Sequence, residues 1–329
     1  MCAVSDFDEI KLKREKMPKL IVVLPCYNEE EVLSTTIEEL TPLMQSLIDS
    51  NKISQDSFLC FVDDGSRDKT WSIIEQFSLS NTMVRGLKLA NNVGHQNALL
   101  AGLLSNKDRA DIYISIDCDL QDDISVIPKM VELYVAGNEI VYGVRSSREV
   151  DTLFKRKSAE IFYDVQEAVG VDIIKNHADY RLISNRVLDA LSKYQERNLY
   201  LRAMFPLIGF KSDVVYYQRK ERLAGETKYP LKKMLSFAWD GITSFSTVPL
   251  KLITVLGATI FVVSMLISFW IIFIKIFTDQ AVPGWASTTL PIYFIGGIQL
   301  LSVGIIGEYI GKIYAETKQR PRFIIDKTV

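Results

Sequence analysis

A long uncharged apolar segment near the C-terminal end limits the fold of this chain more than any other feature. Residues 252–274 form a run of about 23 residues without a charged side chain, enough to cross a bilayer as a helix. A second uncharged run covers 290–306. Aromatic side chains flank both runs, as they do at membrane interfaces. We therefore expect two transmembrane helices, at about 250–276 and 288–311, rather than two buried core helices.

Positive charges flank the two expected spans and are absent between them. The loop 278–289 contains no Lys or Arg. Basic residues precede the first span and follow the second: Lys228, Lys232, Lys233, Lys251, Lys312, Lys318, Arg320, Arg322 and Lys327. Because positively charged loops stay on the cytoplasmic side, we expect both termini and the large N-terminal part in the cytoplasm, attached to the inner cell membrane.

Composition divides the chain into five regions. Residues 1–18 form a polar tail without the apolar core of a signal peptide. Residues 19–228 are expected to form one large cytoplasmic domain. Residues 229–248 mix apolar side chains with lysines, which indicates an amphipathic helix on the membrane surface or, alternatively, a soluble helix. Residues 249–313 hold the two spans, and 314–329 form a basic cytoplasmic tail.

Short apolar runs alternate with helical patterns in residues 19–228. The expected strands are 20–24, 58–62, 84–89, 111–116, 139–144 and 213–217. The expected helices are 29–50, 69–77, 95–104, 124–136, 151–169 and 187–191. This alternation with short connections predicts an α/β fold with a mostly parallel sheet that is covered on both faces.

Bulk charge and cysteine content exclude several classes of protein. The net charge of −2 gives no case for nucleic-acid binding. The four cysteines show no C-x-x-C spacing and the chain has only two histidines, which argues against a structural zinc site. We expect reduced cysteines, as in the cytosol.

Two carboxylates follow the fourth expected strand. Asp117 and Asp119 are two residues apart, so they point the same way if the strand continues through them. Ligands of open α/β sheets bind at the carboxyl ends of the strands. Two acidic oxygens there suit Mg²⁺ or Mn²⁺, with phosphate completing the coordination shell. On this motif alone, a solvated acidic turn is an equal alternative.

Polar clusters also follow the first and second strands. We interpret Tyr27 as stacking on a base and Glu29 as bonding the polar edge of that base. Asp63 and Asp64 are candidates for binding uracil or ribose hydroxyls. Acidic residues also stabilise helix N-termini, and Asp-Gly-Ser favours a turn, so structural roles are the alternative. Three such clusters at one sheet edge predict a nucleotide site that a metal completes.

Five motifs in order along the chain resemble the family-2 glycosyltransferases of the GT-A fold. These motifs are Pro25-Cys26-Tyr27-Asn28-Glu29, Val62-Asp63-Asp64-Gly65-Ser66, Asn92-Val93-Gly94-His95-Gln96, Asp117-Cys118-Asp119-Leu120-Gln121-Asp122 and Ala224-Gly225-Glu226-Thr227-Lys228-Tyr229. The last motif, the two spans and Gly307-Glu308-Tyr309-Ile310-Gly311 narrow the resemblance to polyprenyl-phosphate glycosyltransferases, such as bactoprenol glucosyltransferases and dolichol-phosphate mannose synthases. The resemblance covers nearly the whole chain and implies a Rossmann-like GT-A domain before the membrane helices.

The resemblance also implies a reaction and its ligands. The reaction is inverting transfer of a sugar from a nucleotide sugar, such as UDP-glucose or UDP-N-acetylglucosamine, to a polyprenyl phosphate such as undecaprenyl phosphate. The product would supply sugar for glycosylation of the cell envelope. The implied Mg²⁺ or Mn²⁺ ligands are Asp117, Asp119 and Gln121. The implied nucleotide-binding residues are Pro25, Tyr27, Glu29, Asp63, Asp64 and Asp117. Glycines in the second span permit close helix packing, so we expect a homo-oligomer.

The acceptor phosphate requires positive charge more than it requires a base. A phosphate oxygen is already anionic near neutral pH, so catalysis rests on positioning and charge neutralisation. The candidate acceptor-phosphate and diphosphate ligands are Arg145, Arg148, Arg156, Arg219, Arg222 and Lys228. At the reacting centre we expect Asp119, Arg145 and Asp179. Asp179 would orient the sugar or acceptor or act as a base, with Arg181 as its structural partner. His95 and Gln96 would either approach the donor or pack.

One departure from the family pattern affects the metal loop. Relatives carry prolines after the Leu-Gln pair, whereas this chain has Asp122-Asp123-Ile124. The local loop geometry is therefore expected to differ.

Other functions explain less of the sequence. A processive polysaccharide synthase normally carries Gln-x-x-Arg-Trp, which is missing here. A non-enzymatic component of a glycolipid flipping pathway would not need Asp117 and Asp119. A phosphatase with an aspartate nucleophile would leave the nucleotide motifs unexplained. A dinucleotide-dependent oxidoreductase is disfavoured because Gly-x-Gly-x-x-Gly does not follow the first strand.

Overall fold

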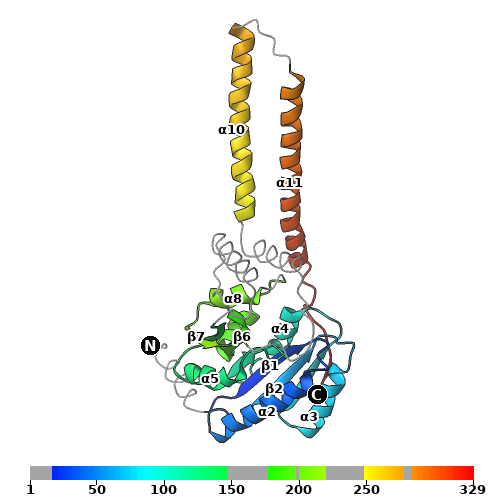
Figure 1. Ribbon diagram of the computed structural model, residues 1–329, viewed down its shortest axis with the longest axis vertical. Coiled ribbons are helices and arrows are strands. Elements are labelled where there is room, and N and C mark those ends of the chain that lie inside the picture. The colour runs from blue at the N-terminus through cyan, green and yellow to red at the C-terminus, as the bar shows by residue number, and fades with distance from the viewer. Residues whose placement is uncertain (1–16, 147–176, 198–199, 220–247, 278–283) are drawn as a thin grey trace. The chain divides into compact units, whose positions relative to one another are not determined.

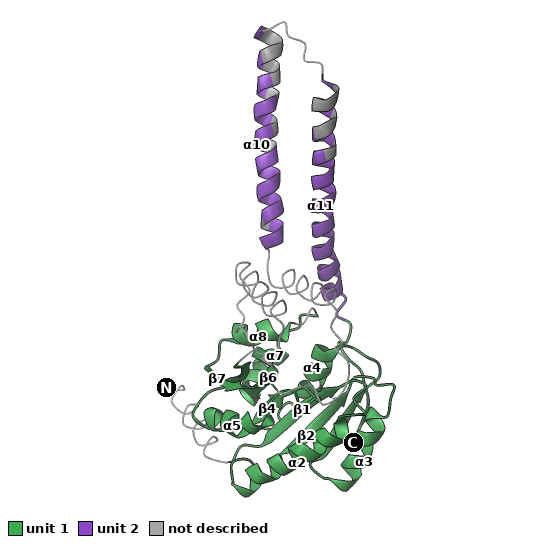
Figure 2. Cartoon of the chain, in the orientation of Figure 1, with its two compact units in different colours: residues 1–164, 172–230, 320–329 green, residues 165–171, 231–319 purple. Residues whose placement is uncertain are grey.

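The computed structural model describes residues 17–146, 177–197, 200–219, 248–277 and 284–329. The chain divides into two compact units (Figure 2). The first contains residues 1–164, 172–230 and 320–329, and the second contains residues 165–171 and 231–319. The helix expected over 151–169, and all but the last residue of the amphipathic helix expected over 229–248, lie outside the described residues.

An eight-stranded sheet forms the centre of the first unit (Figure 1). Its strands are β1 (Leu20–Cys26), β2 (Phe58–Asp63), β3 (Val84–Leu89), β4 (Ile112–Ser115), β5 (Ile140–Arg145), β6 (His177–Ser184), β7 (Ser212–Tyr217) and β8 (Ile325–Thr328). The spatial order is β7-β5-β6-β4-β1-β2-β3-β8. Only β6 and β8 run against the other strands of this sheet. The predicted mostly parallel sheet is therefore confirmed.

Helices cover both faces of the sheet, which explains why β1 and most of β2 consist of apolar residues. Every residue of β1 and β2 is buried. One face packs against α2 (Leu33–Asp49), α3 (Thr70–Ser80) and α5 (Ile127–Val135). The other face packs against α4 (His95–Ser105) and α7 (Asn185–Ser192), and α8 (Leu201–Ile208) packs on α7. A short 3₁₀ turn, η1 (Ile124–Val126), precedes α5.

Two strands of the sheet were not predicted. Strand β6 lies between β4 and β5, and its two charged side chains, Asp179 and Arg181, interrupt the apolar pattern expected of a buried strand. Strand β8 is short and exposed, so it carries no apolar signal. It extends the sheet at β3, where Val329 and Gly86 exchange two backbone hydrogen bonds of 2.9 Å. The stretch expected to be a basic tail thus ends in a strand of the catalytic sheet.

The second unit contains two long helices, α10 (Val248–Phe277) and α11 (Trp285–Thr317). By length and composition, each includes a stretch able to cross a membrane, Val248–Ile267 and Phe294–Thr317. Large apolar side chains on both helices are exposed, Leu252 by 64% and Leu300 by 77%. Helices in the core of a soluble domain bury such side chains, so the alternative of two core helices does not fit the described residues.

Close packing of α4 on the sheet yields a test of this architecture. A Cβ atom added to Gly102 would lie 2.6 Å from Val62 Cγ2 and closer still to Val23 Cγ1. We therefore expect Gly102→Ala to destabilise the first unit by about 1–3 kcal/mol through overpacking. The measurement is thermal unfolding of the full chain in detergent. The half-buried Ser105 lies on the same helix, and Ser105→Ala serves as the control. Equal melting temperatures for the two variants would contradict this packing.

Candidate active site

Polar side chains gather at one edge of the sheet because of the strand directions. Strands β1, β2, β4, β5 and β7 all end at this edge. Strand β6 runs the other way and therefore begins there. As a result, the start of β6 brings Asp179 to the edge where β4 is followed by Asp117-Cys118-Asp119, called the D-x-D motif below. This is the ligand-binding edge of open α/β sheets.

The D-x-D carboxylates lie in a turn rather than on the strand. Strand β4 ends at Ser115, earlier than predicted, so strand alternation does not determine the directions of Asp117 and Asp119. The turn is held by Asp119, whose Oδ1 accepts the Gln121 N–H at 3.2 Å. Leu120, between Asp119 and Gln121, has a φ of +52°, and the chain reverses direction there. Both aspartates are partly exposed, whereas the Oδ1 atom of Asp117 is itself buried.

His95, the first residue of α4, links the D-x-D turn to β6. Its Nε2 lies 3.4 Å from Asp117 Oδ1 and 3.8 Å from Asp179 Oδ2. Burial raises the pKa of the Asp117 carboxyl, while attraction to His95 acts in the opposite direction. His95 therefore lies among the acidic side chains of this edge, and its approach to the donor stays a prediction. Gln96 instead accepts the Leu201 N–H at 2.9 Å, which is a packing role at the start of α8.

Asp179 is held by two guanidinium groups. Arg181, two residues along β6, donates to Asp179 Oδ1. Arg202 on α8 donates from Nη2 to Oδ2 at 3.0 Å and from Nε to Oδ1 at 3.4 Å. Burial by itself would raise the pKa of Asp179, but Arg202, Arg181 and His95 together hold that pKa well below its usual range. Asp179 is therefore a carboxylate, not a carboxylic acid, at neutral pH.

Asp122 occupies the position where the sequence departs from the family pattern. Its side chain is buried, and Oδ1 accepts the Tyr217 hydroxyl at 2.5 Å and Arg145 Nη2 at 3.2 Å. The next residue, Asp123, has a φ of −73°, within the range of a proline, and its carboxylate caps η1 by accepting the Ser125 N–H. An acidic cap thus replaces the rigidity of a proline in this loop.

Gln121 and the loops after β1 and β2 are organised by further hydrogen bonds. Gln121 is buried, and its Oε1 accepts a hydrogen bond from Arg219. The Asn28 N–H donates to Ser66 Oγ at 2.9 Å, which joins the β1 and β2 loops. Tyr27 projects from this junction with 36% of its surface exposed, so its ring is available for stacking.

Asp63 and Asp64, the predicted nucleotide ligands after β2, are buried and bonded to backbone N–H groups. Both are buried, and burial raises the pKa of both carboxyls. Asp64 accepts the backbone N–H groups of Val93 at 2.7 Å and Gly94 at 3.0 Å, immediately before α4. Asp63 Oδ1 accepts the Ser66 N–H at 3.1 Å. In this structure the two carboxylates hold the loops that carry Tyr27 and His95, and their direct contact with a nucleotide stays a prediction.

Four predicted ligands lie outside the described part of the chain, and two residues that were not predicted lie at the site. Arg148, Arg156, Arg222 and Lys228 lie outside the described residues. In the described part of the chain, no three His, Cys, Asp or Glu side chains are placed to hold a metal by themselves. The sequence did not reveal Arg202 or Tyr217, because nothing in the pattern around them places their side chains beside the distant aspartates.

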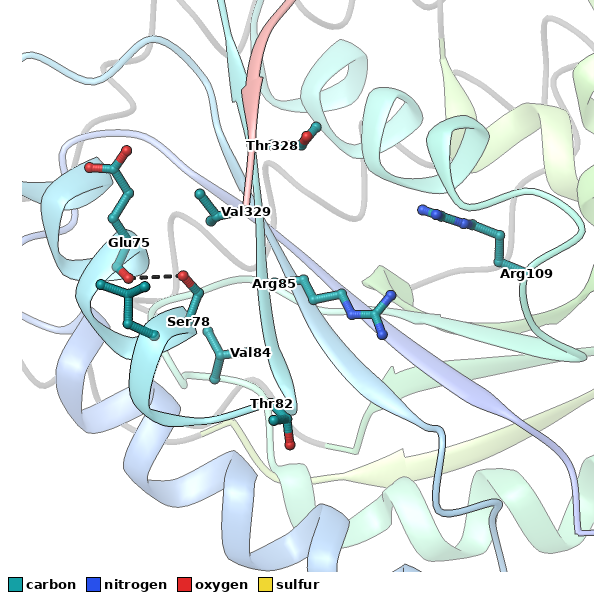
Figure 3. Close-up of a pocket in the computed structure, with 9 residues that line it drawn as sticks. Glu75, Ser78, Thr82, Val84, Arg85, Arg109, Thr328 and Val329 are labelled. Atoms are coloured by element: carbon teal, nitrogen blue, oxygen red, sulfur yellow. Dashed lines mark hydrogen bonds between the residues drawn. The ribbon is translucent and has the colours of Figure 1, made fainter.

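A cavity among the described residues lies away from this edge. It has a volume of about 900 Å³. Its lining includes Arg85, at the start of β3, Arg109, before β4, and Val329, at the end of the chain (Figure 3). These positions are at the amino ends of the parallel strands, opposite the D-x-D turn. The cavity is therefore not the candidate site.

The depressed pKa of Asp179 predicts how stability depends on pH. An ionised carboxylate with a lowered pKa stabilises the fold above its unfolded pKa of about 3.8, and this contribution is lost as pH falls through the lower folded value. We expect Asp179→Asn to cost about 3 kcal/mol at neutral pH, because two guanidinium groups lose their partner. The stability gap from wild type should shrink below about pH 3.8.

Thermal unfolding of the full chain from pH 7 to pH 3 measures that gap. Asp56 is exposed, and Asp56→Asn serves as the matched control with a small and constant effect. A gap for Asp179→Asn that stays constant over the whole pH range would show that the carboxyl is not held ionised by its neighbours.

Comparison with known proteins places this site in a family. The model named Glycosyl transferase family 2 matches residues 21–192. The glycosyltransferase YkoT of Bacillus subtilis (strain 168), itself named as uncharacterized, is 52% identical over 95% of this chain and 93% of its own length. The bactoprenol glucosyl transferase of Shigella phage SfX is 39% identical over 93% of this chain and 98% of its own length.

Solved structures give a weaker likeness. A mannosyltransferase from Pyrobaculum calidifontis, solved with GDP-Man and Mn²⁺, is similar with a TM-score of 0.42 and 13% identity, over 94% of this chain and 90% of that one. The family model and the relatives carry the assignment, and the mostly parallel sheet followed by two apolar helices agrees with the predicted GT-A class. The chain belongs to glycosyltransferase family 2.

Proposed function

We propose that this protein transfers a sugar, with glucose as the first candidate, from a nucleotide sugar to a polyprenyl phosphate such as undecaprenyl phosphate. The observation that carries the proposal is the match, over nearly its whole length, to proteins named bactoprenol glucosyl transferase. That match includes the region of α10 and α11, not only the catalytic sheet. The two apolar helices support an acceptor whose lipid tail stays in a bilayer.

The donor is proposed to bind at the carboxyl edge of the sheet. Tyr27 is exposed for stacking on the base, and Glu29 lies beside it in the same loop. UDP is favoured over GDP by the bactoprenol relatives. Asp63 accepts a backbone N–H group of the loop after β2, and Asp64 accepts two from the loop before α4, so both help to fix the loops at this edge.

A divalent metal fits the D-x-D turn. Asp117 Oδ1 is buried and has no hydrogen-bond donor among the described residues, and His95 Nε2 lies 3.4 Å from it. Carboxylate oxygens of this kind suit Mg²⁺ or Mn²⁺, so Asp117 and Asp119 are proposed as ligands, with Gln121 as a third. When bound, the metal would neutralise charge on the departing nucleoside diphosphate.

The transfer step requires little proton chemistry from the protein. An oxygen of the acceptor phosphate attacks the anomeric carbon, and the bond from that carbon to the nucleoside diphosphate breaks with inversion. A doubly ionised phosphate monoester has no proton to lose. Because its pKa is held well below the usual range, Asp179 is a weak base, so we assign it to accepting hydrogen bonds from sugar hydroxyls.

Positive charge must hold two phosphate groups near each other. Arg145 lies at the end of β5 on the same edge as Asp117, and we propose it as a ligand of the acceptor phosphate. Arg148, Arg156, Arg222 and Lys228 are proposed to add to this charge. The Lys and Arg pattern around the spans supports a cytoplasmic catalytic domain at the inner leaflet. Association through the glycines of α11 is proposed in addition.

A donor panel tests the proposal. Purified full-length protein would be mixed with undecaprenyl phosphate, Mg²⁺ or Mn²⁺ and separate nucleotide sugars, and the glycolipid would be identified by mass. We expect a hexose–phosphate–polyprenol product, formed best with UDP-glucose. If no donor yields a glycolipid, transfer to a polyprenyl phosphate is wrong. A polymer as product would point instead to a processive synthase.

The metal and the D-x-D turn are tested in the same assay. Chelation with EDTA is expected to stop the reaction, and Mg²⁺ or Mn²⁺ to restore it. Asp119→Ala should lower the rate by about 100-fold or more, because charge on the leaving diphosphate is no longer neutralised. Asp56→Ala, on an exposed loop, is the matched control. Full activity of Asp119→Ala would exclude this carboxylate from the reaction.

A further inference from the structure

A buried acid in the loop after β4 takes no part in the proposed transfer step. Asp122 is 2% exposed and lies immediately after Gln121. Its Oδ1 accepts hydrogen bonds from Tyr217 and from Arg145. These partners come from two other strands, so one carboxylate oxygen joins the loop after β4 to the ends of β5 and β7.

The sheet register places the two partners side by side. In the parallel pairing of β5 with β7, Arg145 is opposite Tyr217. Arg145 Nε also lies 3.4 Å from the Tyr217 hydroxyl, so the three side chains form a closed triangle. Just beyond, the Ser146 N–H and hydroxyl donate to the Tyr217 carbonyl oxygen at 2.8 and 3.0 Å. The backbone that leads out of β5 is therefore fixed beside the triangle.

Burial restricts the movement of the three side chains of this triangle. An unpaired buried carboxylate is costly, so Asp122 favours the arrangement in which both donors stay in place. Burial, followed by the charge of Asp122, raises the pKa of Tyr217 far above its usual range, so its hydroxyl keeps the proton that it donates. Tyr180 packs edge-on against the Tyr217 ring, with 5.4 Å between centroids, and limits its rotation.

Arg145 keeps donors free while it is held. A guanidinium has five N–H groups, and the triangle uses one on Nη2 and the one on Nε. The side chain is 25% exposed, and no Arg145 nitrogen is both buried and unpaired in the described part of the chain. The two N–H groups of Nη1 therefore remain available to solvent or to a ligand. Their planar arrangement matches the oxygens of a phosphate.

We propose that Asp122 and Tyr217 are positioning residues that orient the Arg145 guanidinium toward the acceptor phosphate. This inference rests on the proposed function, in which a prenyl monophosphate is the acceptor. According to this inference, Asp122, which follows the predicted metal ligand Gln121, affects the affinity for the acceptor and not the affinity for the donor.

Kinetics of variants test the assignment. Asp122→Asn keeps the size of the side chain but loses its charge, so Arg145 loses its fixed orientation. We expect the KM for undecaprenyl phosphate to rise about tenfold and the KM for the nucleotide sugar to change less than about twofold. Tyr217→Phe leaves the Asp122–Arg145 pair intact and should raise the acceptor KM by a smaller factor.

A double variant separates positioning from a general structural role. If Asp122 acts through Arg145, Asp122→Asn should add nothing to the acceptor KM in an Arg145→Gln background. Asp213, exposed on β7 and bonded only locally to the Val214 N–H, provides the matched control Asp213→Asn, which should behave as wild type. An unchanged acceptor KM in Asp122→Asn, a further tenfold rise in the double variant, or an equal rise in donor KM would each overturn the inference.

A binding measurement keeps the inference distinguishable from the proposed function. Affinity of the full chain for farnesyl phosphate, a soluble prenyl monophosphate, requires no turnover. Weaker binding by Asp122→Asn and Tyr217→Phe, with unchanged binding by Asp213→Asn, supports the inference even if no sugar is transferred and the proposed function fails. Equal binding by all variants, or no binding by wild type, overturns it.

Discussion

The reversed direction of β6 is the constraint on which the site depends. Strand β6 lies between β4 and β5 but runs against them, so it begins at the edge where they end. Asp179, near its start, thereby reaches the neighbourhood of Asp117, with His95 between them. In a parallel orientation the start of β6 would lie at the opposite edge, beyond reach of the D-x-D turn. The topology therefore determines which carboxylates share one site.

Gathering several carboxylates at one edge requires compensation, and the compensating groups come from other elements. Helix α8 supplies Arg202 to Asp179, and β5 supplies Arg145 to Asp122. The loop before α4 supplies backbone N–H groups to Asp64. Each pairing fixes a loop or helix relative to the sheet, because a buried charge is costly when its partner moves away. The interactions that neutralise the buried carboxylates therefore also fix the positions of the loops and helices that form the site.

The sequence predicted the parts of the fold that follow a regular apolar pattern. Strand β3 was predicted with its observed bounds, and the ends of β1, β2 and β5 were displaced by one or two residues. The edge that carries the site followed from strand direction alone. Strand β6 was missed because its charged residues, Asp179 and Arg181, pair with each other inside the protein and break the pattern. The contacts of Arg202 and Tyr217 were missed because they depend on tertiary distances between segments far apart in sequence. The burial of Asp63 and Asp64 was hidden for the same reason.

The position of β8 in the chain sets an order of assembly. Strand β8 completes the sheet at β3, yet it is synthesised after both apolar helices. While the ribosome makes α10 and α11, β3 is an open edge with unpaired backbone groups, a state that favours pairing with other chains. The sheet can gain β8 only after α11 has been translated. Completion of the catalytic domain is therefore coupled to synthesis of the hydrophobic segments, and a chain that stops before α11 would carry the D-x-D turn on an unfinished sheet.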